Sequence, residues 1–256
     1  MLYYFNKNGL YMIQVITISI RQFLLSRHYM ALLMLGPIVE TLLIVTVFAV
    51  SVRVLTPQTG DDLLRFILPA LWLASILQRS FEVSAYNLMD DKLTREIENF
   101  LMAPLSTGKI LIGWVGFALI NGFIVGLLLW VFLIPFEWII PVDMGLALLW
   151  MILGVVFCAL CGILSSIYSS SWDSISLKVS FIFIPGLYLS GVFYSIERLP
   201  DVFADLMEWN PFYLLINGFR DAVRGHSLEY HDMLIMIGYV ICIALLCNIS
   251  FKKLKQ

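Results

Sequence analysis

Four long intervals without a charged residue constrain this chain more than any other feature of its sequence. They lie between Lys109 and Glu137, Asp143 and Asp173, Lys178 and Glu197, and Asp232 and Lys252. A helix needs about 20 apolar residues to cross a hydrocarbon core of about 30 Å, so each interval can form a span. Backbone polar groups must be paired inside lipid, which leaves helices or closed barrels. Barrel strands alternate in polarity, whereas these intervals are apolar throughout, and we therefore expect helices.

The composition excludes a water-soluble domain. Of the 256 residues, 61% are hydrophobic and 13% are charged, where a soluble domain carries about 25% charged residues. The net charge of −2 offers no basic face to a nucleic acid. We therefore expect an all-α polytopic membrane protein that contacts membrane lipid and forms a single transmembrane domain over residues 1–256.

Six spans are expected, at 31–52, 63–86, 110–134, 145–168, 176–195 and 233–251. An amphipathic helix at 10–27 precedes them and is expected to lie in the membrane interface. The β-branched run within it also leaves a strand open. Most Lys and Arg residues fall on the side that holds both termini, so the positive-inside rule places both termini in the cytoplasm.

Glu40 falls inside the first expected span, and Arg79 and Glu82 fall inside the second. A carboxylate near the middle of a span costs about 2.5–3.5 kcal/mol and tends to pair or to face a cavity. At a rise of about 1.5 Å per residue, Glu40 lies about 13 Å and Arg79 about 10 Å from the same end. We predict that Glu40 and Arg79 form an ion pair. A proton-coupling role for Glu40 is the alternative.

The cytoplasmic loop at 87–109 contains the pattern of a short amphipathic helix, expected at 91–102. Its apolar residues Leu93, Ile97, Phe100 and Leu101 share one face. Asp91 precedes Arg95 by four residues, the favourable order for an ion pair within a helix. Pro104 ends the pattern. The apolar stripe is thus expected to be available to a partner or to the membrane surface.

The outer segment between the last two spans predicts two short helices within 199–225, separated by Asn210 and Pro211 and ended by Gly225. Neither is long enough to span, so we expect a re-entrant or interfacial hairpin. The second helix places Arg220 on its polar face. Six aromatic residues gather at this end and form either an interfacial belt or a surface where substrate leaves: Phe193, Tyr194, Trp209, Phe212, Tyr213 and Phe219.

Small residues form two faces in the middle spans. They are Gly122 and Gly126 in one span, and Gly154, Cys158 and Gly162 in the next. Such faces permit close helix contact, and packing within one subunit is favoured over dimerisation. Cys158 and Cys161 have a metal-site spacing but no second pair of ligands, so no metal site is expected. Pro185 and Gly186 predict a kink in the fifth span.

The loop sequence TREIENFLMAPLS (94–106) resembles the coupling-helix region of ABC-2 type ABC transporter permeases. The outer stretches LSGVFYSIERLP (189–200) and WNPFYLLINGFRDAVRG (209–225) resemble the last third of that family. Among its members the chain looks most like the short permeases of the polysaccharide, nodulation-factor and drug-export branches. The residues that this resemblance assigns to ATPase coupling are Asp91, Leu93, Arg95, Glu96, Ile97, Glu98, Phe100 and Leu101.

The resemblance implies a half-transporter that pairs with a second copy of itself and with two ABC ATPase subunits. ATP and Mg²⁺ would then be bound by the partner ATPase, with no cofactor in this chain. The phosphate-binding pattern G-x-x-x-x-G-K-[ST] is absent from the sequence, in agreement with the binding of ATP by a separate chain. The chain itself is therefore not expected to be an enzyme.

The leading expectation is a permease half-subunit of an exporter in the inner membrane, moving an amphiphilic substrate (glycan, lipid-linked or drug-like) outward. One alternative is a membrane scaffold or assembly protein without a transport path. Another is an ion-coupled secondary transporter that uses Glu40. If the resemblance holds, changes at Leu93, Ile97 or Phe100 should uncouple ATP hydrolysis from transport while the fold stays intact.

Overall fold

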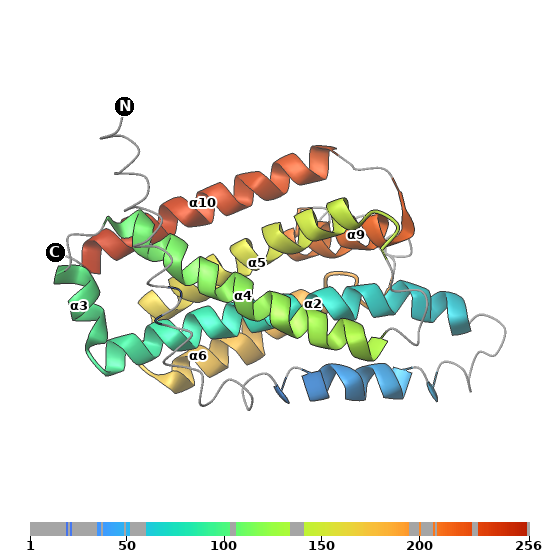
Figure 1. Cartoon of the computed structure of the whole chain (residues 1–256), viewed down its shortest axis with the longest axis horizontal. Coiled ribbons are helices and arrows are strands. Elements are labelled where there is room, and N and C mark those ends of the chain that lie inside the picture. Colours follow the sequence, from blue (N-terminus) through green and yellow to red (C-terminus); the bar gives the residue numbers. More distant parts are fainter. Residues whose placement is uncertain are drawn as a thin grey trace.

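The fold is all-helical in the part of the chain that the structure, a computed structural model, describes (Figure 1). The described residues are 19, 21, 35–36, 38–48, 50–51, 60–102, 106–133, 141–194, 200, 207, 209–226 and 230–254. Within them, four helices are long and apolar enough to cross a membrane. These are α2 (Gly60–Leu93), α4 (Thr107–Leu133), α5 (Met144–Ile167) and α10 (Tyr230–Leu254).

The helices α4, α5 and α10 agree with the spans expected at 110–134, 145–168 and 233–251 to within one helical turn. Helix α2 contains the span expected at 63–86 and continues for two further turns to Leu93. The span expected at 31–52 is represented by the shorter apolar helix Ile38–Phe48. The interface helix expected at 10–27 lies outside the described residues except for Ser19 and Arg21.

The fifth expected span, 176–195, is not one continuous α-helix. It consists of α6 (Trp172–Lys178), a π-helix η2 (Val179–Phe183) and α7 (Ile184–Tyr188). Pro185 has no N–H to donate to the preceding turn, and its ring clashes with the carbonyl four residues earlier. The change in winding just before Pro185 agrees with the predicted kink. The segment ends at Tyr188 instead of at 195, because a turn follows in which Gly191 has a positive φ of 81°.

Helix α2 lies at the centre of the fold. Of its most apolar 18-residue stretch, 89% is buried, against 22% for α10. It packs most extensively against α5 and α4, and Figure 1 shows α4 crossing it. A Cβ added at Gly162 of α5 would lie 2.4 Å from the carbonyl oxygen of Phe81, and one at Gly122 of α4 would lie 2.8 Å from Ser80 Oγ. Both small-residue faces therefore serve packing within the subunit, as predicted.

Helix α9 (Pro211–Arg224) begins and ends where the sequence places the second outer helix. The Asn210 side chain accepts a hydrogen bond of 3.0 Å from the Phe212 N–H, and Pro211 occupies the first turn, where its missing N–H is not needed. Gly225 ends the helix at a left-handed φ of 80°. Helix α9 packs against α2, α5 and α10.

Arg220, expected on the polar face of the second outer helix, is buried in the structure. Only 3% of this residue is exposed. Its Nε donates to the Phe66 carbonyl at 3.1 Å, and Nη2 donates to the Gly191 carbonyl at 2.9 Å. The guanidinium also lies 3.7 Å from the centre of the Phe66 ring. Arg220 thus joins α9 to α2 and to the turn after α7, because two backbone carbonyls and an aromatic ring replace the water that a charge requires.

Replacing Arg220 with methionine should lower the free energy of unfolding by about 2–3 kcal/mol, since hydrogen bonds to charged groups contribute about 1.5–3 kcal/mol each. Arg220→Lys should keep only part of this stability, because lysine lacks the planar guanidinium group that reaches both carbonyls. Arg224→Met is the matched control, because Arg224 is exposed on the same helix. Thermal unfolding of the purified protein in detergent measures the difference. Equal unfolding temperatures for the two methionine variants would contradict this role of Arg220.

Candidate functional site

The candidate site is a sharp corner between α2 and the short helix α3 (Glu96–Met102). One helix was expected at 91–102, but α2 ends at Leu93 and a two-residue turn follows. The backbone N–H and the hydroxyl of Thr94 both donate to the Asp90 carbonyl, at 2.9 and 2.8 Å. Arg95 then adopts a left-handed φ of 60°, a conformation that commonly ends helices. The expected helix is therefore divided into the end of α2 and α3.

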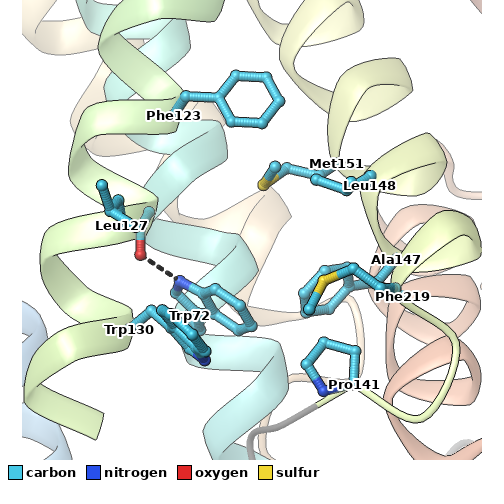
Figure 2. A pocket seen from close by; sticks show the side chains of 11 residues that line it. Trp72, Phe123, Leu127, Trp130, Pro141, Ala147, Leu148, Met151 and Phe219 are labelled. Atoms are coloured by element: carbon cyan, nitrogen blue, oxygen red, sulfur yellow. Dashed lines mark hydrogen bonds between the residues drawn. The ribbon is translucent and has the colours of Figure 1, made fainter. Parts of the chain in front are cut away.

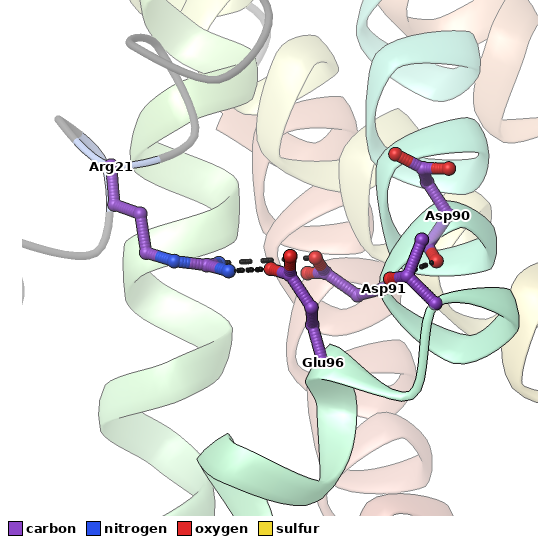
Figure 3. Close-up of polar contacts among 5 residues, drawn as sticks. Arg21, Asp90, Asp91 and Glu96 are labelled. Atoms are coloured by element: carbon purple, nitrogen blue, oxygen red, sulfur yellow. Dashed lines mark hydrogen bonds and ion pairs between the residues drawn. The ribbon is translucent and has the colours of Figure 1, made fainter.

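Arg21 contacts one residue on each of the two helices at this corner, as Figure 3 shows. Its Nη1 lies 3.8 Å from Asp91 Oδ1, and its Nη2 donates to Glu96 Oε2. The expected pair between Asp91 and Arg95 is not among the ion pairs of the described residues, since the turn carries Arg95 off the face of α2. Arg21 comes from the segment expected to lie in the interface, so that segment contacts both helices of the corner.

Ile97 is turned inward, which corrects the expected docking stripe. It is 9% exposed and belongs to an apolar cluster at this end of the fold. The other buried members of the cluster are Leu88, Ile110, Leu111, Trp114, Leu160, Ile163, Ile167, Cys247 and Phe251. The side chains of Phe100 and Leu101 lie outside the described part. A charge at Ile97 would disrupt this cluster, so Ile97→Asp cannot test docking with the fold intact.

A different set of side chains faces outward at the corner. Leu93 is 50% and Met102 76% exposed. We call the exposed set the corner surface: Asp90, Leu93, Thr94, Arg95, Glu98 and Met102. It combines two apolar side chains with charges of both signs. Leu93, Arg95 and Glu98 are among the residues that the resemblance assigns to coupling. Met102 is not, because the turn at Thr94 and Arg95 changes which face of α3 looks outward.

Lys92 binds the corner to the end of α5, and Lys178 binds α6 to the same end. Lys92 Nζ donates to the carbonyls of Ser166, Ile167 and Ser169 at 2.9, 3.2 and 2.6 Å. Lys178 Nζ, from α6, donates to the Ser165 carbonyl at 2.9 Å, to the Tyr168 carbonyl at 3.4 Å and to Ser169 Oγ at 2.8 Å. The last carbonyls of a helix have no partner within it and carry a partial negative charge. The ends of α2, α5 and α6 are therefore joined through the same group of acceptors.

The structure does not bring Glu40 and Arg79 together as an ion pair. Arg79 is buried, whereas Glu40 is exposed on the helix 38–48, and no ion pair joins them among the described residues. Counting residues along a span gives the depth of a side chain but not its direction around the helix, which is why the predicted pair is wrong. The contact between these helices is a hydrogen bond between the hydroxyls of Thr41 and Ser75.

The six outer aromatic residues do not form one surface. Phe219 is fully buried, with its ring edge-on to Trp72 at 5.4 Å, so it belongs to the core and not to an exit surface. Phe193 stacks on Phe48 at 5.0 Å, and Phe212 packs against Phe157 and Phe183. Tyr194 donates its hydroxyl to the Leu189 carbonyl. Tyr213 is half-buried, and Trp209 is largely exposed.

Comparison with known proteins identifies the chain. Residues 13–223 match the ABC-2 type transporter family. The chain belongs to the ABC-2 type transporter family. It is also 34% identical over 169 residues to the inner membrane transport permease YadH of Escherichia coli strain K12, and equally similar to the YadH of Shigella flexneri. The matched region is 65% of this chain and 65% of the length of each YadH.

The chain is thus a member of a membrane transporter family, and the relatives that it matches are named transport permeases. Permeases of this family are the transmembrane components of their transporters, and they generally work with ATPase partners. Among the described residues, no group of three or more His, Cys, Asp or Glu side chains could hold a metal ion. The corner itself consists of hydrogen bonds, ion pairs and an exposed surface of apolar and charged side chains.

Proposed function

We propose that this chain is the transmembrane subunit of an ATP-driven exporter in the inner membrane, and that it moves an amphiphilic substrate outward. ATP and Mg²⁺ are bound by a separate ATPase chain, and two copies of the permease pair with two ATPase subunits. The helix Ile38–Phe48 and the segment from α6 to α7 complete six spans, with both termini in the cytoplasm. The distribution of Lys and Arg residues and the name of YadH support this placement.

The observation that carries the proposal is the attachment of α3 to the core. Ile97 anchors α3 in the apolar cluster, Arg21 links it to the end of α2, and Lys92 links that end to α5. Helix α2 is the most buried of the four long helices. A force applied to α3 is therefore applied to the central helix of the transmembrane domain, which is what coupling to a separate ATPase requires.

The corner surface has the composition of a protein-binding site. Leu93 and Met102 supply exposed apolar contacts, and Arg95 and Glu98 supply charges of opposite sign beside them. Asp90 adds a negative charge, which would be repelled by the anionic headgroups of the cytoplasmic leaflet. We therefore assign this surface to the ATPase and not to the membrane.

The double variant Leu93→Asp, Met102→Asp should bind the ATPase at least about tenfold more weakly, because truncating or charging a buried contact residue costs about 2 kcal/mol or more. The fold should be unaffected, since both side chains are exposed. Binding is measured by titrating the purified ATPase chain encoded with this permease against the permease in nanodiscs.

Tyr230→Asp is the matched control, because Tyr230 is 72% exposed and begins α10 at the other end of the molecule (Figure 1). Unchanged ATPase affinity in the double variant would refute the assignment of the corner surface. Substrate movement into liposomes that contain no ATPase would refute the whole proposal and would favour the ion-coupled alternative through Glu40.

A further inference from the structure

A cavity of about 190 Å³ lies between α4 and α5, at the end of the fold opposite α3 (Figure 2). Its lining residues come from α2, α4, α5, α9 and the stretch before α5. Trp72, Ala147 and Phe219 are buried and form its inner wall. Leu127, Met144 and Leu148 are exposed and line its opening. The cavity therefore opens sideways, on the outer face of the helix bundle.

The inner wall offers nothing to a polar ligand. The Trp72 indole N–H donates to the Gly126 carbonyl at 2.9 Å, so the donor on this wall is already satisfied. The remaining side chains of the inner wall are hydrocarbon and aromatic. Apolar cavities of about 150 Å³ in proteins stay dry and bind apolar molecules, so water is not the expected occupant.

The position of the opening and the side chains around it indicate that it faces the hydrocarbon core of the membrane. On α4 the cavity extends from Phe123 to Trp130, and on α5 from Met144 to Met151, about 10 Å along each axis. This depth fits within one leaflet, which is about half of a 30 Å core. The exposed side chains beside the opening include Leu128, Val131 and Leu149, all apolar. A bilayer thus presents acyl chains to this opening.

One polar group at the outer end of the cavity lacks a partner. Trp130, in the last two turns of α4, has a buried Nε1 without a hydrogen-bond acceptor among the described residues. Tryptophan is enriched at the depth where the ester groups of phospholipids lie. An ester carbonyl there would accept the Trp130 N–H while the chain attached to it continues past Leu127 toward Phe123.

We propose that this cavity binds one acyl chain of a phospholipid from the leaflet opposite α3, with the ester carbonyl accepting a hydrogen bond from Trp130. The bound chain lies against Trp72 of α2 and Phe219 of α9, and so fills the space that these helices leave between α4 and α5. Trp72 and Phe219 close the cavity from the interior, which makes it a site on the side wall and not part of a path through the membrane. The inference does not depend on the proposed function.

The test uses the full-length chain in nanodiscs that contain phosphatidylcholine with a diazirine in the middle of one acyl chain. After illumination, cross-linked residues are mapped by mass spectrometry. We expect labelling of Phe123, Leu127 and Met151. Leu148→Trp fills the opening and should reduce this labelling at least about tenfold, because a filled cavity removes the apolar contact that retains the chain.

Leu149→Trp is the matched control, because Leu148 and Leu149 are both 38% exposed on α5 and only Leu148 lines the cavity. It should leave the labelling within about twofold of that in the wild-type protein. A twofold change corresponds to a smaller free energy than the loss of one apolar contact. Trp130→Phe keeps the ring without the N–H and should lower retention of the lipid in native mass spectrometry. Equal labelling in the two tryptophan variants of α5 would overturn the site. Cross-links between the α4–α5 faces of two copies, abolished by Leu148→Trp, would assign the cavity to a second copy and would also overturn it.

Discussion

Replacing Lys92 with methionine should leave the ATPase bound but should weaken the connection between α3 and the end of α5. Lys92 supplies three of the hydrogen bonds that join α2 to the carbonyls of Ser166, Ile167 and Ser169. Methionine has a similar length but donates none. Because the site is partly open to water, the expected loss of stability is modest, about 1–2 kcal/mol. The larger effect is expected on the transmission of movement.

This effect can be measured without knowing the substrate. Spin labels at position 99 on α3, which is not part of the corner surface, and at position 177 on α6 should report a narrow distance distribution in the wild-type complex, both before and after ATP is trapped on the ATPase. In Lys92→Met the distribution should broaden on trapping, while Lys92→Arg, which keeps the charge and the donors, should restore the narrow distribution. Lys252→Met is the control, because Lys252 is exposed at the same end of the fold. A distance distribution that stays narrow in Lys92→Met would show that this lysine stabilises the structure locally and does not transmit movement.

The second large effect is expected from adding a single methyl group at Gly162. Its Cβ would lie 2.4 Å from the Phe81 carbonyl oxygen and 3.1 Å from the Ala85 nitrogen. Both atoms belong to the backbone of α2, so a side-chain rotation cannot relieve the clash and the two most closely packed helices must separate. Overpacking typically costs about 1–3 kcal/mol, and we expect Gly162→Ala at the upper end of that range.

The direction of the change in unfolding temperature distinguishes a packing clash from the effect of helix propensity. Alanine favours a helix over glycine by about 1 kcal/mol, so a glycine without close neighbours should be stabilised by the same change. Gly238 in α10 is such a glycine, since nothing lies within 4 Å of a Cβ added there. Unfolding temperatures in detergent should therefore fall for Gly162→Ala and stay equal or rise for Gly238→Ala. A common shift in both variants would mean that the contact between α2 and α5 is looser than the structure shows.

The sequence predicts those features of the fold that have a local cause. Uncharged intervals locate α4, α5 and α10, because lipid tolerates neither exposed charge nor unpaired backbone. Asn210, Pro211 and Gly225 locate both ends of α9, because each residue acts on the backbone next to it. The small-residue faces indicate close packing within the subunit for the same reason: the space that glycine leaves is a property of the residue itself.

The features that the sequence does not predict depend on distant partners. Lys92, Lys178 and Arg220 bind backbone carbonyls, and every residue type has a carbonyl, so no sequence pattern marks the acceptor. Periodicity shows that Leu93 and Ile97 share a face of one helix, but the turn at Arg95 divides that helix and turns Ile97 inward. The Trp130 donor and the cavity beside it likewise arise only when α4, α5 and α9 are brought together.

The π-helical turn before Pro185 has a consequence for the outer half of the fifth span. A π-helix accommodates one more residue per turn than an α-helix, and one residue of an α-helix corresponds to about 100° of rotation. If residues 179–183 wound as an ordinary α-helix, every side chain beyond Phe183 would point about 100° away from its present direction. The stack of Tyr188 and Phe193 against Phe48 therefore exists in only one of the two windings. A change of winding at this single turn would break the aromatic contact with the helix 38–48, while the hydrogen bonds of Lys178 would still hold α6 at the end of α5.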